Sequence, residues 1–219
     1  MDSKQPRFDA APGDAEADRA ARRRFVRGGL ASAPVLLSVV SRPVSAAACS
    51  AASSFASVNM SRGPKTYNCG GRTPGYWKQE CKFWDWPAGY IPSASAVNCP
   101  GPDADYTPPY NATATLFDTV FGAAGGYPGK TLVWVLGNGG NLYDRDALAR
   151  HIVAALLNAA KGITPPTVLS VPTVKNIWAS FVSLGYYEPT AGIKWYPGYS
   201  VPASSTGGLI AWLQSTMPV

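Results

Sequence analysis

The chain has 219 residues, of which 46% are hydrophobic, 11% aromatic and only 15% charged, and its formal net charge is +6. A charged fraction well below the usual quarter, combined with 22 Gly and 20 Pro, excludes a coiled coil, a collagen and a disordered tail. No uninterrupted apolar run reaches the roughly 18 residues of a membrane span, so a transmembrane segment is not expected.

The first 46 residues have the composition of an export signal rather than of a folded domain. An Ala-rich, acidic start is followed by a basic cluster, a weakly apolar run over 30–40 and small residues up to Ala48. The segment resembles a twin-arginine export signal cleaved after Ala46 or Ala48, which implies the twin-arginine export machinery as a partner. The alternative, an amphipathic surface helix, is disfavoured because Pro34 and Pro43 interrupt it. The residues that carry the resemblance are Arg22, Arg23, Phe25, Arg27 and Ala46.

Cleavage at this place would change the charge of the protein. Residues 1–46 contain 8 basic and 5 acidic residues, which leaves 11 basic and 8 acidic residues and a net charge of +3. The basicity therefore belongs largely to the signal, and a nucleic-acid partner is not predicted. A lipoprotein signal with lipid on Cys49 is a second possibility, because small residues precede this cysteine.

The cysteines fit an oxidising compartment. They are four in number and all fall in the first third of the mature chain. An even count in an exported protein predicts two disulfides, and the sequence leaves all three pairings open. A zinc site is disfavoured because no Cys-x-x-Cys pair occurs. The cysteines are Cys49, Cys69, Cys81 and Cys99.

Two longer motifs carry a family resemblance. They are Cys69–Lys78 (CGGRTPGYWK) and Ala149–Ala160 (ARHIVAALLNAA). Together with segments at 116–117 and 133–140 they resemble a family of exported bacterial proteins, most of them uncharacterised. The resemblance implies a fold and a location outside the cytosol but no particular activity. In that family Asn-His-Pro commonly follows the lysine, whereas Gln79 follows it here, so a metal site at this point is not expected.

The clearest helix is expected over 144–161. Asp144 is suited to cap its start and Gly162 to end it in a left-handed turn. Its apolar face consists of Leu148, Ile152, Ala155, Leu156 and Ala159. The residues expected to point away from this face are Arg150, Asn158 and Lys161.

Other segments complete the expected fold. Apolar residues at helical spacing predict helices over 113–121, 172–184 and 207–217. Residues 130–136 are ambiguous, because their composition favours a strand and the family resemblance a helical turn. Residues 186–205 are expected to form an ordered aromatic loop.

The predicted fold class is mainly α. We expect a small irregular helical domain with long aromatic, Pro- and Gly-rich loops and two disulfides. The mature chain, 47–219, would be a single domain with a disulfide-stapled loop region over 47–110 and a helical part over 111–219.

Candidate catalytic groups are few. His151 is either a general base or a side chain satisfied by a buried carbonyl or acid, and the second is favoured because no Gly-x-Ser-x-Gly elbow, free cysteine or orienting acid accompanies it. Asp103 and Asp105 are a candidate carboxylate pair, but acids that cleave sugars usually come from separate elements. They also lack the further oxygen ligands of a calcium site. A secreted hydrolase using His151 or a carboxylate pair is therefore an alternative, and no catalytic residue or metal is predicted.

Cofactor binding is not predicted either. The segment 137–142 (GNGGNL) has the first two glycines of a Gly-x-Gly-x-x-Gly dinucleotide fingerprint, but Leu142 stands where the last glycine would be. We therefore interpret this segment as a turn before the helix at 144–161.

The aromatic residues are the strongest functional signal. Rings concentrated over 76–90 can stack on sugars or anchor a protein interface, or they can form the core. We predict an exported extracellular or envelope protein that binds or associates through aromatic surface loops, without catalytic activity; a carbohydrate-binding module is an alternative. The expected partners, besides the export machinery, are cell-surface polysaccharide or envelope proteins. The candidate binding residues are Tyr76, Trp77, Trp84 and Trp86.

Overall fold

The computed structural model describes residues 48–56, 66–123, 126–138, 145–198, 200–201 and 208–218. All of them belong to one compact unit, Ala46–Val219. The expected export signal over 1–46 and the expected cap at Asp144 lie outside the described residues. None of the helices in these ranges is long and apolar enough to cross a membrane.

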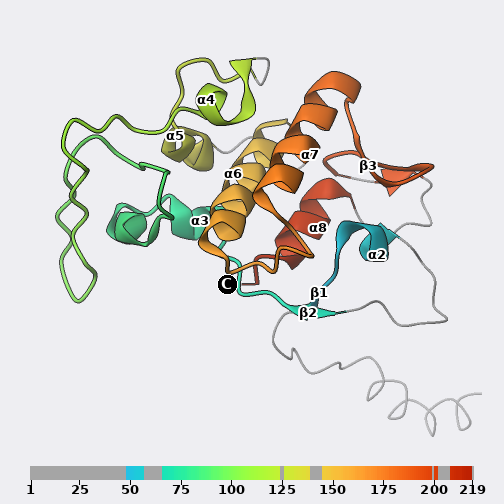
Figure 1. Ribbon diagram of the computed structural model, residues 1–219, viewed down its shortest axis with the longest axis horizontal. Coiled ribbons are helices and arrows are strands. Elements are labelled where there is room, and N and C mark those ends of the chain that lie inside the picture. Colours follow the sequence, from blue (N-terminus) through green and yellow to red (C-terminus); the bar gives the residue numbers. More distant parts are fainter. Residues whose placement is uncertain are drawn as a thin grey trace, which may run out of the picture. The chain divides into compact units, whose positions relative to one another are not determined.

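Helices make up most of the regular structure, and the longest of them, α6, contacts α3, α5, α7 and α8 (Figure 1). In chain order the helices are α2 (Ala52–Ala56), α3 (Pro74–Trp77), the 3₁₀ helix η1 (Glu80–Asp85), α4 (Phe117–Phe121), α5 (Leu132–Gly137), α6 (Arg145–Lys161), α7 (Val171–Leu184) and α8 (Leu209–Ser215).

Helix α6 is the centre of the core, as the sequence predicts. Leu148, Ile152 and Leu156 are fully buried on its apolar face. Burial extends further round the helix, because His151 and Asn158 are also buried. The expectation that Asn158 points away from the core is therefore wrong. A polar side chain that is buried in this way needs hydrogen-bond partners inside the protein.

Helix α7 has the ends that its sequence predicts. The Ser170 hydroxyl accepts a hydrogen bond from the Thr173 amide at the first turn, and Pro172 occupies a first-turn position. The helix ends at Gly185, whose φ of 80° is the left-handed conformation that glycine adopts most easily. Its buried residues, Val174, Ile177 and Trp178, pack into the core.

The expected mainly α fold class is wrong. In the described part of the chain 45% of residues are helical and 10% lie in strands. Strands β1 (Ala48–Cys49) and β2 (Tyr67–Asn68) pair antiparallel, and β3 (Tyr187–Thr190), β4 (Ile193–Trp195) and β5 (Ser200–Val201) form a second antiparallel sheet. These strands are only two to four residues long, so they show too little alternation to be recognised in sequence.

The second sheet occupies the segment expected to be an aromatic loop. Tyr187 pairs with Trp195, and the turn between them contains Gly192, which has a φ of 83°. Aromatic residues favour strands, but Pro189 within β3 breaks the strand pattern. The aromatic residues here therefore build a small sheet rather than a loop.

The segment over 113–137 differs from the expectation in detail. The helix expected over 113–121 is shorter in the structure, where α4 covers only Phe117–Phe121. The residue before it, Leu116, instead forms an isolated antiparallel β-bridge with Thr131. The ambiguous residues 130–136 contain α5, and the Thr131 hydroxyl caps it by accepting a hydrogen bond from the Trp134 amide. The helical interpretation is thus confirmed.

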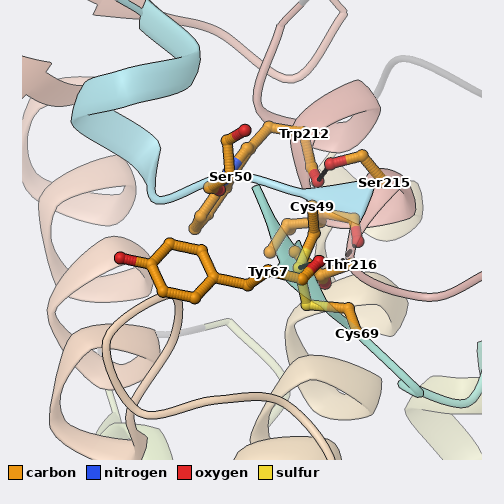
Figure 2. Close-up of a disulfide and its surroundings, with 8 residues drawn as sticks. Cys49, Ser50, Tyr67, Cys69, Trp212, Ser215 and Thr216 are labelled. Carbon is orange, nitrogen blue, oxygen red and sulfur yellow. Dashed lines mark hydrogen bonds between the residues drawn. A yellow bond between two sulfur atoms is a disulfide. The ribbon is translucent and has the colours of Figure 1, made fainter. Parts of the chain in front are cut away.

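Two disulfides are present, and no described cysteine is free. Cys49 is bonded to Cys69 and Cys81 to Cys99. Figure 2 shows the first disulfide near Ser215 and Thr216 at the end of α8, and the Trp212 indole of the same helix donates a 3.0 Å hydrogen bond to the Ser50 carbonyl. A sulfur of Cys49 joined to Cys69 carries no lipid, so this structure corresponds to the disulfide prediction rather than to the lipoprotein alternative.

Candidate functional site

The two motifs meet in the fold at Asn158. Its Oδ1 accepts hydrogen bonds from the Arg72 amide at 2.8 Å and from the Trp77 indole at 3.0 Å, while its Nδ2 donates to the Arg72 carbonyl at 2.9 Å. One buried amide on α6 thus satisfies three groups of the Cys69–Lys78 motif. This arrangement fixes the motif, and with it the short helix α3, against α6.

Gly71 allows this close approach. A Cβ atom at position 71 would lie 2.2 Å from the Thr216 carbonyl oxygen and 3.0 Å from Asn158 Nδ2. Any side chain there would have to displace the backbone that follows α8. The motif, α6 and the end of α8 therefore pack together at one point.

A cavity of about 290 Å³ lies beside this point. Its lining comes from α3, α5, α6 and α8, and we call it the basic pocket. Its polar and charged lining residues are Thr73, Lys78, Arg150, His151 and Gln214. Its other lining residues are Pro74, Gly75, Leu136 and Met217. The volume is at the lower end of the range for small-molecule sites, which is roughly 300–1,000 Å³.

His151 lines the basic pocket with both ring nitrogens engaged. Nδ1 lies 2.7 Å from the Ala147 carbonyl oxygen, so Nδ1 carries the proton and donates it. Nε2 lies 3.3 Å from Gln214 Nε2 and accepts from that amide. Burial lowers the pKa of His151 below its ordinary value, outweighing the hydrogen bond to Ala147, which raises it; the nearby Arg150 lowers it further. His151 is therefore neutral at neutral pH, and its role is to hold Gln214 in place.

Two positive charges at the basic pocket have no anionic partner among the described residues. Lys78, just after α3, is exposed, and Arg150 is half-buried on α6. The ion pairs found in the described ranges involve other residues, Lys82 with Asp103 and Lys161 with Asp85. In addition, the Nε atom of Arg150 is buried and has no hydrogen-bond partner in the described ranges. An unpartnered buried donor costs free energy, and an acceptor brought to it by a ligand would remove that cost.

The predicted aromatic binding residues do not form a surface. Trp77 is 0% and Trp86 7% exposed, and the Trp86 indole donates to the Trp77 carbonyl at 3.1 Å. Tyr76 is half-buried, and its hydroxyl donates to Asp85. Trp84 is 47% exposed. Most of the aromatic cluster is therefore core, and a single exposed indole is a small platform for stacking on a sugar.

The carboxylates expected as catalytic alternatives lie outside the basic pocket. Asp103 forms a 2.5 Å ion pair with Lys82, and Asp105 accepts a hydrogen bond from the Cys99 amide at 2.9 Å. Both therefore stabilise the loop that the Cys81–Cys99 disulfide closes. The fold does not bring His151 together with Asp103 and Asp105 at the basic pocket. Within the described ranges, no group of His, Cys, Asp and Glu is arranged to hold a metal ion.

His151 is the only described lining residue that the sequence marks as a candidate functional residue, and three of the others, Lys78, Arg150 and Gln214, matter most for the site. Lys78 and Arg150 stand inside the two motifs, so the motifs themselves were the available signal. Arg150 was expected to point away from the helix's apolar face, which is compatible with a place at a pocket rim. The place of Gln214 in the pocket could not be predicted, because no sequence pattern indicates that the last helix contacts His151.

Comparison of the chain with protein-family models, curated proteins and solved structures found no match in any of the three. The geometry of the basic pocket is therefore the main indication of function.

Proposed function

We propose that this chain is an exported protein that acts by binding a small ligand in the basic pocket, without catalysing a reaction. The observation that carries the proposal is the pocket itself, formed where the two motifs come together. Motifs that build a rigid core around one cavity are a common way to preorganise a binding site.

The contacts of His151 argue against catalysis. A general base needs a free ring nitrogen within reach of the substrate, and both nitrogens of His151 are already engaged with Ala147 and Gln214. No carboxylate among the residues that the structure describes lines the basic pocket. The Thr73 hydroxyl accepts a hydrogen bond from the Tyr76 amide as the cap of α3, so it is occupied in holding that helix.

The proposed location outside the cytosol has two supports. The first is the resemblance of residues 1–46 to a twin-arginine signal. The second is the pair of disulfides, since such bonds persist mainly in oxidising compartments.

A matched pair of variants tests the binding function. Gly75 lines the basic pocket, and a Cβ at position 75 meets only the Thr73 hydroxyl, at 3.6 Å, so Gly75→Leu adds bulk there without a backbone clash. Gly137→Leu is the control, because a Cβ at 137 meets nothing within 4 Å and the residue does not line the pocket.

The experiment is a thermal-shift screen of the mature protein with small molecules of anionic, cationic and neutral classes. Compounds that raise the Tm of the wild type and of Gly137→Leu, but not of Gly75→Leu, are expected. Each active compound is then recovered and should be chemically unchanged. A screen without active compounds, or with compounds that stabilise Gly75→Leu equally, would contradict the proposal, and turnover that depends on His151 would favour the hydrolase instead.

A further inference from the structure

We infer that the ligand of the basic pocket is a small oxyanion, a carboxylate or a phosphate, attached to a short apolar body. This inference rests on the proposed binding function and names its ligand class. It is argued from the charge, the donors and the apolar lining of the pocket.

The charge of the lining is positive. Lys78 and Arg150 both line the basic pocket, and the side chain of neither forms an ion pair or hydrogen bond within the part of the chain that the structure describes. No acidic side chain of the described residues lines the pocket. Like charges held at one cavity repel each other, and an anion between them would relieve this repulsion. A cationic ligand would increase it.

The donors at the basic pocket match an oxyanion. The guanidinium of Arg150 presents several N–H groups in a plane, a geometry suited to two oxygens of a carboxylate or phosphate, and its buried Nε lacks an acceptor. Lys78 supplies a second charged donor from the opposite motif. The amide of Gln214 is a third polar group, and the contact with His151 orients it by engaging its Nε2.

The remaining lining sets the size and polarity of the rest of the ligand. Pro74, Leu136 and Met217 form an apolar wall, which favours a hydrophobic body next to the anionic group. At about 30 Å³ per water molecule, a cavity of about 290 Å³ holds about ten water-sized groups. The ligand is therefore the size of a small aromatic acid or its phosphate counterpart.

Four probes of similar shape and different charge test this inference. Benzoate and phenyl phosphate are the anionic probes, benzamide is the neutral probe and benzylamine the cationic one. Calorimetric titration of the disulfide-bonded mature protein should show binding of benzoate, phenyl phosphate or both, with about tenfold weaker binding of benzamide and none of benzylamine. The tighter of the two anions identifies the oxyanion that the pocket recognises.

Charge-removing variants assign the binding to named residues. Arg150→Gln and Lys78→Gln should each weaken binding of the anion by about tenfold, the effect of losing one hydrogen bond to a charged group. Lys175→Gln, on the exposed face of α7, is the control and should leave binding unchanged. Lys78 is itself exposed, so its variant is expected to fold even if Arg150→Gln does not.

The outcomes separate this inference from the proposed function. Benzamide that binds as tightly as the anions and is blocked by Gly75→Leu would leave a binding pocket but overturn its preference for anions. Anion binding that is unaffected by both Arg150→Gln and Lys78→Gln would overturn the inference in the same way. Absence of binding by all four probes would overturn the anion inference, whereas the broader screen decides the binding function.

Discussion

Trp77 and Asn158 are 81 residues apart in sequence, yet the Trp77 indole donates a 3.0 Å hydrogen bond to the Asn158 side chain in the core. Both residues are 0% exposed. Because the same side chain also bonds the Arg72 backbone through both its oxygen and its nitrogen, it is the point at which the first motif is attached to α6. The position of the basic pocket depends on this attachment.

Replacing Asn158 should therefore be costly. Asn158→Ala leaves the buried Trp77 indole without its partner, which costs about 1–3 kcal/mol, and the half-buried Arg72 amide and carbonyl add a smaller cost because water can reach them. We expect a loss of about 2–5 kcal/mol in the free energy of unfolding, measured with urea and intact disulfides. Asn176→Ala, on the exposed face of α7, is the matched control and should change stability by less than about 0.5 kcal/mol. Equal losses in the two variants would contradict the role of Asn158.

Gly71 gives a second test of the packing of the first motif against α6 and the end of α8. Gly71→Ala places a Cβ 2.2 Å from the Thr216 carbonyl oxygen, so the segment after α8 must move. Overpacking of this kind costs about 1–3 kcal/mol. In Gly70→Ala, the neighbouring control, the nearest atom is the Ile163 carbonyl oxygen at 3.8 Å, an ordinary contact. Thermal unfolding should therefore show a clearly lower Tm for Gly71→Ala than for Gly70→Ala, and the same Tm for both would refute the close packing.

The sequence predicts the long helices well, but it does not predict the contact of Asn158 with Arg72 and Trp77. Helices α6 and α7 have apolar residues at helical spacing, and α7 also has both terminal signals, Ser170 and Gly185. Such local signals do not depend on the rest of the fold. Asn158 was misplaced because a polar residue on a helix is normally solvent-exposed, and only the contact with Trp77 reveals its buried role.

The strands and the basic pocket were missed for related reasons. Strands β3 and β4 are too short to show alternation, and their stability comes from pairing with each other and from packing of Trp195 against Trp212. The pocket requires Gln214 from the last helix to meet His151 across 63 residues. No local sequence pattern predicts a contact between residues so far apart in the chain. The aromatic cluster over 76–90 was visible, but the sequence does not distinguish a ring in the core from a ring on the surface.

The protonation of His151 predicts a pH dependence of stability. Burial keeps the pKa of His151 in the folded protein below its ordinary value of 6.5. The folded state then binds this proton less readily than the unfolded state does. The stabilising contribution of neutral His151 is therefore complete above pH 6.5 and is lost as the pH falls through 6.5 toward the folded-state pKa.

Urea unfolding at neutral pH and at about pH 5 measures this effect, since that interval begins above the ordinary pKa of histidine and ends below it. The wild type should lose more stability over the interval than His151→Gln, which has no imidazole to protonate. An equal loss in both proteins would show that His151 is not held neutral.

Export is tested by the pair Arg22 and Arg23. Twin-arginine export depends on both residues, so Arg22→Lys with Arg23→Lys should leave the uncleaved precursor in the cytosol, where its cysteines stay reduced. Fractionation of the host cells with thiol labelling measures location and oxidation together. Arg7→Lys with Arg19→Lys is a matched control in the same segment, and it should be exported normally. Normal export of the first variant would contradict the twin-arginine interpretation.

The central claim is that Arg150 binds an oxyanion in the basic pocket, and the nuclear magnetic resonance signal of its Nε–H group tests it most directly. This group is buried and has no hydrogen-bond partner among the described residues, so an anion that the Arg150 guanidinium binds should shift its signal strongly. Titration with benzoate or phenyl phosphate is predicted to shift the Arg150 Nε–H signal in step with the calorimetric binding curve, and benzamide to leave it nearly unchanged. An Arg150 signal that stays constant while either anion binds would contradict the claim.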